Sequence, residues 1–209
     1  MTLYRRALGN PINRTVKRIF DITFSSVVLA ILAIPVFVPI AIGVRLSSEG
    51  PAFFRQKRIG YLGRQFYCIK FRSMYLNNEC DTQSATRDDA RITPFGRILR
   101  RLSLDELPQF WNSLVGDMSV VGPRPHMCSM NDRYASVLPD YNVRQTIKPG
   151  ITGWAQINGL RGNADDLKHI QQRLKHDLWY LEHWSFFLDL KIVARTAYDI
   201  LTGHDKNAF

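Results

Sequence analysis

Two adjacent carboxylates, Asp105 and Glu106, lie near the middle of the chain, with basic residues on either side. Arg100 precedes them, and the segment 122–125 (Gly-Pro-Arg-Pro) places Arg124 between two prolines. Carboxylates can attack phosphorus or bind a metal ion, and one guanidinium group can donate two parallel hydrogen bonds to phosphate oxygens. These residue types in this order indicate phosphoryl-transfer chemistry.

Each of these residues also has an ordinary structural explanation. A helix over 107–114 would place Asp105 near its N-cap, where a carboxylate complements the helix dipole, and Pro108 in its first turn. Arg124 could pair with a nearby acid such as Asp117. The prolines around Arg124 limit the entropy it would lose on binding an anion, which favours the phosphate interpretation.

The stretch 148–162 is rich in glycine and contains Lys148 and Arg161. We expect a loop that brings backbone N–H groups and Arg161 near a diphosphate. Its spacing is not that of a Walker loop, and no dinucleotide-binding fingerprint is present. The histidines at 169, 176 and 183 predict a solvated or interfacial helix face, which we prefer to a metal site.

Composition limits the class of protein. The 209 residues suffice for one domain with an appendage, and the net charge of +10 indicates an anionic partner. Nucleic acid, phosphorylated small molecules and anionic lipid all satisfy that charge. Cys68, Cys80 and Cys128 are widely spaced, which argues against a disulfide framework or a zinc site and fits a reducing compartment.

Residues 22–44 form a run without a charged side chain. As a helix this run would be about 34 Å long, enough to cross a bilayer. A crossing helix and a re-entrant helix are both open, but Pro35 and Pro39 interrupt the hydrogen-bond ladder and predict a bend. Basic residues flank both ends, which favours entry and exit on one side. The run 16–21 is expected to approach the membrane interface with its cations at headgroup level.

The rest of the chain predicts an α+β fold that is mostly helical. We expect two short strands or a hairpin over 51–75, a short helix within 91–102 and another over 127–138. One or two amphipathic helices over 165–201 carry dense aromatic residues, which suit a membrane interface or core packing equally. The expected organisation is a membrane-anchoring part at 1–48 and a catalytic domain at 49–209.

Several motifs in series resemble those of the bacterial sugar transferases, the monotopic phosphoglycosyl transferases that begin glycan assembly on polyprenyl phosphate. They are, in chain order, KRIFD, the proline-broken apolar run, KFRSM, SLDELPQFWN, GDMSVVGPRP, KPGITGWAQING and HDLWYLEHWSFFLDLKI. The resemblance covers nearly the whole chain, from Val16 to Leu201. In such enzymes a Ser-Pro pair bends the membrane helix, and here Ile34 stands in the place of the serine.

The resemblance implies a role for each matching residue. Asp105 would attack the sugar-linked phosphorus of a UDP-sugar and expel UMP, and polyprenyl phosphate would then attack the covalent intermediate. Glu106 would hold Mg²⁺, which neutralises the diphosphate. The residues expected to bind substrate are Arg72, Arg100, Arg124, Lys148, Arg161 and Asp177.

Finer features of the resemblance concern the donor and the location. The segment 158–162 and the ending 203–209 resemble the catalytic domain of long undecaprenyl-phosphate glucose or galactose phosphotransferases, either as a short relative or as part of a longer protein. UDP-glucose or UDP-galactose is preferred, for exopolysaccharide, capsule or O-antigen synthesis. The enzyme would lie in the bacterial inner membrane facing the cytoplasm, without nucleic acid, and self-association is open. The alternatives are a membrane-anchored anionic-ligand or nucleic-acid binding module, or a scaffold, without catalysis.

Overall fold

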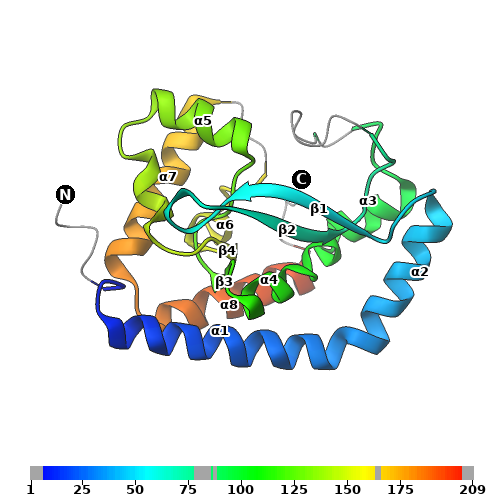
Figure 1. Ribbon diagram of the computed structural model, residues 1–209, viewed down its shortest axis with the longest axis horizontal. Coiled ribbons are helices and arrows are strands. Elements are labelled where there is room, and N and C mark those ends of the chain that lie inside the picture. The colour runs from blue at the N-terminus through cyan, green and yellow to red at the C-terminus, as the bar shows by residue number, and fades with distance from the viewer. Residues whose placement is uncertain (1–6, 78–85, 87–88, 163–165, 204–209) are drawn as a thin grey trace.

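The computed structural model describes residues 7–77, 86, 89–162 and 166–203. Helix α1 runs along the lower edge of the molecule, α2 turns upward at one end, and a β-hairpin crosses in front of the remaining helices (Figure 1). The expected mostly helical fold with a small hairpin is confirmed. Cys80 and the residues after 203, which contributed to the sequence expectations, lie outside the described residues.

The elements follow one another in a simple order. The helices are α1 (Pro11–Leu32), α2 (Val38–Ser47), α3 (Pro94–Arg101), α4 (Gln109–Val115), α5 (Cys128–Val137), α6 (Trp154–Ile157), α7 (Leu167–His183) and α8 (Phe186–Thr202). The strands are β1 (Phe53–Ile59) and β2 (Gln65–Phe71), which pair antiparallel, and β3 (Ser119–Val121) and β4 (Gly150–Thr152), which pair parallel. Short helical turns are η1 (Ala33–Phe37), η2 (Tyr61–Gly63), η3 (Leu104–Glu106) and η4 (Tyr141–Thr146).

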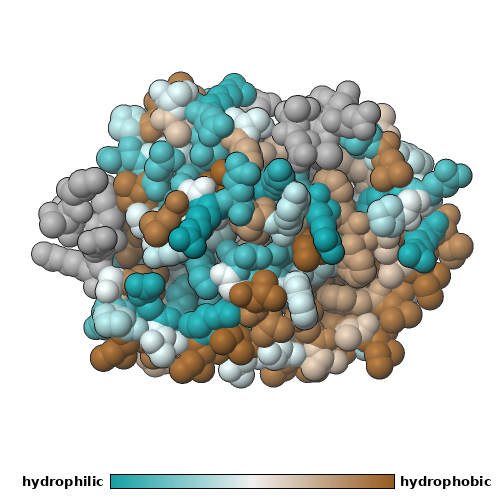
Figure 2. Space-filling model, in the orientation of Figure 1, coloured by the Kyte–Doolittle hydropathy of each residue, from teal (hydrophilic) through white to brown (hydrophobic). Residues whose placement is uncertain are grey.

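The apolar run lies on the outside of the molecule. It belongs to one helical stretch, Pro11–Ser47, that is long and apolar enough to cross a membrane by length and composition, and only 11% of its apolar window is buried. Within it, η1 is a π-helical turn that contains Pro35, and α2 leaves this turn in a new direction (Figure 1). Figure 2 shows apolar residues along the lower edge, where α1 runs, and around the end where α2 rises.

The start of α1 is fixed to the body of the protein. Lys17 is buried and forms an ion pair with Asp189 of α8, with 2.6 Å between Nζ and Oδ2. Arg18 donates to the carbonyl oxygens of Ser113 and Leu114 at the end of α4, both at 2.7 Å. The expectation of a headgroup-level cation is therefore wrong for Lys17, whose Nζ is buried against Asp189. For Arg18, which is half-buried, it stays a prediction.

The acidic pair does not cap a helix. Ser103 adopts a left-handed conformation with a φ of 54°, and Asp105 and Glu106 follow in the 3₁₀ turn η3. Helix α4 begins only at Gln109, and Pro108 precedes it. The expected N-cap role of Asp105 is thus wrong, and the dipole of α4 does not explain the two carboxylates.

The stretch 148–162 is more ordered than a loop. It contains β4 and α6, and β4 pairs with β3 so that Gly150 lies opposite Ser119 and Thr152 opposite Val121. Gly150 permits this close approach, because a Cβ there would lie 2.0 Å from the backbone nitrogen of Gly122. The strand therefore supports the Gly-Pro-Arg-Pro segment, which follows β3 directly.

Candidate active site

Asp105 and Glu106 line a cavity of about 210 Å³ next to the hairpin. Alternation along the strands decides which hairpin side chains reach it, since successive residues point to opposite faces. Gln56 and Arg58 of β1 and Lys70 of β2 line the cavity together with Asp105 and Glu106. Arg100, Arg124 and Arg161 line it from other segments. The structure therefore brings together residues from five separate parts of the sequence.

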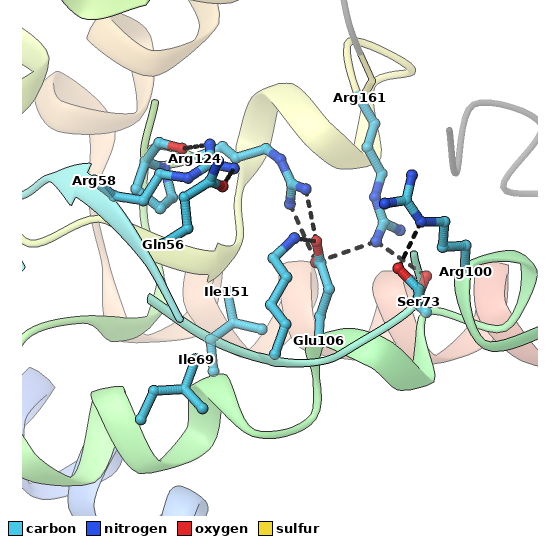
Figure 3. Close-up of polar contacts among 12 residues, drawn as sticks. Gln56, Arg58, Ile69, Ser73, Arg100, Glu106, Arg124, Ile151 and Arg161 are labelled. Atoms are coloured by element: carbon cyan, nitrogen blue, oxygen red, sulfur yellow. Dashed lines mark hydrogen bonds and ion pairs between the residues drawn. The ribbon is translucent and has the colours of Figure 1, made fainter. Parts of the chain in front are cut away.

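Glu106 is held by three cations (Figure 3). Its Oε1 accepts from Lys70 Nζ at 2.7 Å and from Arg124 Nη2 at 2.6 Å. Its Oε2 accepts from Arg124 Nη1 at 3.1 Å and from Arg161 Nη2 at 3.4 Å. The partner of Arg124 is thus Glu106 and not Asp117. A carboxylate has about four acceptor positions, so these contacts account for all of them.

The charge state of Glu106 follows from these contacts. Burial alone would raise the pKa of its carboxyl, but Arg124, Lys70 and Arg161 together hold that pKa well below its usual range. Glu106 is therefore a fixed anion, and it keeps the cations converged on one point of the cavity.

Asp105 differs from its neighbour in its contacts and in the direction of its pKa shift. Its side chain is buried, yet its carboxylate accepts no hydrogen bond and forms no ion pair within the described parts of the chain. Burial raises its pKa, and the adjacent Glu106 adds to this, while Lys70, Arg100 and Arg161 act in the opposite direction. A carboxylate that lines a cationic cavity without a hydrogen-bonding partner can act there as a nucleophile.

Arg100 reaches the cavity because α3 lies very close to the end of the hairpin. A Cβ at Gly96 would lie 1.9 Å from the carbonyl oxygen of Ser73, so only glycine permits this approach. Arg100 Nε then donates to Ser73 Oγ at 2.8 Å (Figure 3). Burial lowers the pKa of Arg100, and the nearby Asp105 opposes this shift.

Arg124 is supported from behind by a buried ion pair. Arg144 donates to the carbonyl oxygen of Arg124 at 2.7 Å and to Asp177 Oδ2 at 2.9 Å. Asp177 does not line the cavity. The structure thus places Asp177 as a positioning residue, acting through Arg144 on the Gly-Pro-Arg-Pro segment.

Two other expected binding residues have different surroundings. Arg72 lines the cavity, but its guanidinium donates to backbone carbonyls of 48–51, so it fastens the connection between α2 and β1. Lys148 lines a different cavity, one that shares no residue with the first. Of the expected residues, the structure therefore converges Asp105, Glu106, Arg100, Arg124 and Arg161.

Lys70 and Arg144 belong to the contacts of this candidate site and were not among the expected residues. Lys70 had a usable signal, because strand alternation places it on the same face of the hairpin as Gln56 and Arg58. Arg144 had none, since its partner Asp177 lies 33 positions away in sequence.

The donor set can be compared with what a magnesium ion requires. Mg²⁺ is usually bound by one or two carboxylates together with substrate phosphates, and it keeps several waters. Asp105 and Glu106 supply adjacent carboxylates at a cavity, and the described residues contain no cluster of three metal-ligating side chains. These residues fit an ion shared with a diphosphate, and do not fit an all-protein cage.

The sequence of this chain matches known proteins over most of its length. Residues 12–203 match the family model described as bacterial sugar transferase. A protein of Xanthomonas campestris pv. campestris named UDP-glucose:undecaprenyl-phosphate glucose-1-phosphate transferase is 49% identical over 180 residues, covering 83% of this chain and 37% of the relative. A Caulobacter vibrioides protein with the same name is 42% identical over 199 residues, covering 93% of this chain and 74% of the relative.

A third relative carries a different donor in its name. The UDP-N-acetylgalactosamine-undecaprenyl-phosphate N-acetylgalactosaminephosphotransferase of Aeromonas hydrophila is 41% identical over 202 residues, covering 94% of this chain and 46% of the relative. The chain spans about two fifths of the length of the first curated relatives it matches. The match to the family model extends over nearly the whole chain, and the chain belongs to the bacterial sugar transferase family.

Proposed function

We propose that this protein transfers a sugar 1-phosphate from a UDP-sugar to undecaprenyl phosphate and releases UMP. The observation that carries the proposal is the contrast between the adjacent carboxylates: Glu106 is bound by three cations, while Asp105 is unpaired among the described residues and lines the same cavity. A diphosphate needs the cations, and a covalent mechanism needs the free carboxylate.

The chemistry has two balanced steps. An Asp105 oxygen attacks the sugar-linked phosphorus, and the bond to the bridging oxygen breaks so that UMP leaves with the electron pair. An oxygen of undecaprenyl phosphate then attacks the same phosphorus, and the bond to Asp105 breaks to restore the carboxylate. Arg124, Lys70 and Arg161 face the phosphate oxygens in both steps, where charge develops.

We propose that magnesium binds at Glu106 with the donor diphosphate. The ion would supply charge neutralisation on the diphosphate. Because all acceptor positions of Glu106 are engaged, one contact must be exchanged for the ion, and the longest is that from Arg161 at 3.4 Å. Arg161 also donates to Ser103 Oγ at 3.0 Å, so this exchange would leave its guanidinium at the cavity wall.

The glucose donor is favoured because four of the curated relatives, at 42–49% identity, carry UDP-glucose in their names. The test is a panel of UDP-glucose, UDP-galactose and their N-acetylated forms, with Mg²⁺ and undecaprenyl phosphate in detergent, in which UMP release is measured. We expect the fastest release with UDP-glucose. No release from any donor by folded protein would contradict the transferase proposal and would favour a binding module without catalysis.

We propose further that the helical stretch 11–47 is re-entrant and that the catalytic part faces the cytoplasm. Support comes from its two ends, which pack on the same body: Lys17 pairs with Asp189, and Val44 packs with Phe71 and Leu99. The missing N–H of Pro35 within η1 accounts for the change of direction. Entry and exit on one side also agree with the basic residues on both flanks.

The topology is tested with an affinity tag before Met1 and protease added to either face of sealed inner-membrane vesicles. The re-entrant arrangement predicts cleavage of this tag, and of a tag after Phe209, from the cytoplasmic face only. Cleavage of the Met1 tag from the periplasmic face alone would indicate a crossing helix.

A further inference from the structure

A second cavity, of about 750 Å³, lies at the N-terminal end of α1. Its walls come from α1, from the hairpin turn at Tyr61 and Leu62, and from the segment 146–148 that precedes β4. None of its lining residues lines the cavity of Asp105. The proposed transferase reaction therefore makes no use of it.

Four cations line this second cavity: Arg14, Lys17, Arg18 and Lys148. Lys17 is already paired with Asp189, which leaves Arg14, Arg18 and Lys148. Two of them crowd the same point, since a Cβ at Gly116 would lie 3.1 Å from Lys148 Nζ and 3.3 Å from Arg18 Nη2. Gly116 ends α4 with a φ of 100°, a left-handed conformation that glycine adopts without steric cost. Like charges held this close repel each other unless an anion lies between them.

Protein partners account for two of the four cations. Lys17 pairs with Asp189 and Arg18 binds the last carbonyls of α4, whereas Arg14 and Lys148 make no side-chain hydrogen bond or ion pair with any described residue. The nearest acids are otherwise engaged: Asp21 accepts from Ser119 and Val120, and Asp117 accepts from Asn112. Asp21 also lines the cavity, but the four cations still outnumber Asp21, Asp117 and Asp189, so the net charge is positive.

The pKa of Lys148 reflects the same surroundings. Burial lowers it, Arg18 and Arg14 lower it further, and the carboxylates of Asp21 and Asp117 act against this shift. A bound anion would offset both the cost of burying the charged lysine and its repulsion by the two arginines.

The cavity also adjoins apolar surface that points away from the protein. Ile19 lines the cavity and is 59% exposed, and Ile12 and Val16 are exposed on the same helix. Leu8 and Pro11 add apolar walls beside the cations. In Figure 2 the apolar lower edge follows α1. A free phosphate ion would use the cations and leave the apolar walls without a partner.

We propose that this second cavity binds one anionic phospholipid of the surrounding membrane, with Arg14, Arg18 and Lys148 around its phosphate and the apolar walls against its glycerol and proximal acyl carbons. Such a site would hold the N-terminal end of α1 at headgroup depth. It would thereby set the height of the Asp105 cavity above the membrane.

The test counts lipids retained by the protein. The full chain is reconstituted in nanodiscs of equal phosphatidylglycerol and phosphatidylcholine, and native mass spectrometry measures each lipid bound after ejection. We expect the wild type to retain phosphatidylglycerol preferentially. The double variant Arg14→Gln/Lys148→Gln should lose about 30-fold in that preference, and Arg14→Gln alone about fivefold. Thermal unfolding in detergent verifies that both variants are folded.

Lys168→Gln/Lys175→Gln is the matched control, because it removes two exposed charges of α7 that lie outside the cavity. It should retain phosphatidylglycerol as the wild type does. Equal losses in the two double variants, or equal retention of both lipids by the wild type, would overturn the proposal. Displacement of the lipid by inorganic phosphate added to the nanodiscs would assign the cavity to a free anion instead.

Discussion

Asp105→Asn is expected to reduce UMP release by at least about 10⁴-fold, because the amide cannot form the covalent bond to phosphorus. The fold should not suffer. Burial and Glu106 raise the pKa of Asp105, so its ionised form costs stability at neutral pH, and a neutral amide removes that cost. Initial rates with UDP-glucose and thermal unfolding in detergent measure the two effects separately.

Asp132→Asn serves as the control, since Asp132 is exposed on α5 outside the cavity. Its rate and its melting temperature should match those of the wild type. If Asp105→Asn kept its rate within tenfold of the wild type, the carboxylate would not be the nucleophile. A large loss of stability in Asp105→Asn would mean that the carboxylate has a structural partner.

Glu106→Gln is expected to destabilise the protein by about 3 kcal/mol even without Mg²⁺ and nucleotide. The amide leaves Lys70, Arg124 and Arg161 without their shared anion in a buried site. The pKa of Glu106 is depressed in the fold, so the stability it provides is present above the ordinary glutamate pKa and is lost as pH falls through the folded value. The difference in melting temperature between wild type and Glu106→Gln should therefore be full at pH 7 and shrink at strongly acidic pH.

This pair of variants separates two roles of Glu106. If Glu106 served only to bind magnesium, its carboxylate would be an unpaired buried anion in metal-free buffer. Replacing it by the neutral amide would then leave the melting temperature unchanged or raise it. A structural anion gives the opposite result. Because Asp105→Asn makes the same chemical change one residue earlier, opposite shifts in melting temperature for the two variants would support the divided roles.

The sequence was sufficient for the elements whose signals are local. Alternating residues predicted the hairpin, the cap-and-proline pattern of Thr93 and Pro94 agrees with the short basic helix α3, and the uncharged run indicated a long apolar helix. Asp105, Glu106 and Arg124 were also within reach, because adjacent carboxylates and a proline-flanked arginine are local patterns. Their convergence in one cavity is what the structure adds.

The sequence is least informative for residues whose partners are distant along the chain. Lys17 resembled an interfacial cation, but its partner Asp189 is 172 positions away. Arg72, Lys148 and Asp177 were expected to bind substrate. The guanidinium of Arg72 donates to backbone carbonyls, Lys148 lines a second cavity, and Asp177 pairs with Arg144. The type of a charged side chain indicates which groups it can bind, and the fold determines which of these groups lies close to it.

The central claim is that Asp105 carries the phosphosugar, and trapping that adduct tests it most directly. The protein is incubated with Mg²⁺ and UDP-glucose labelled in the sugar, without lipid acceptor, and the labelled peptide is identified by mass spectrometry. We predict label on Asp105 with an equivalent of UMP released, loss of the label on adding undecaprenyl phosphate, and no label in Asp105→Asn. A label on another residue, or one that persists in Asp105→Asn, would contradict this mechanism.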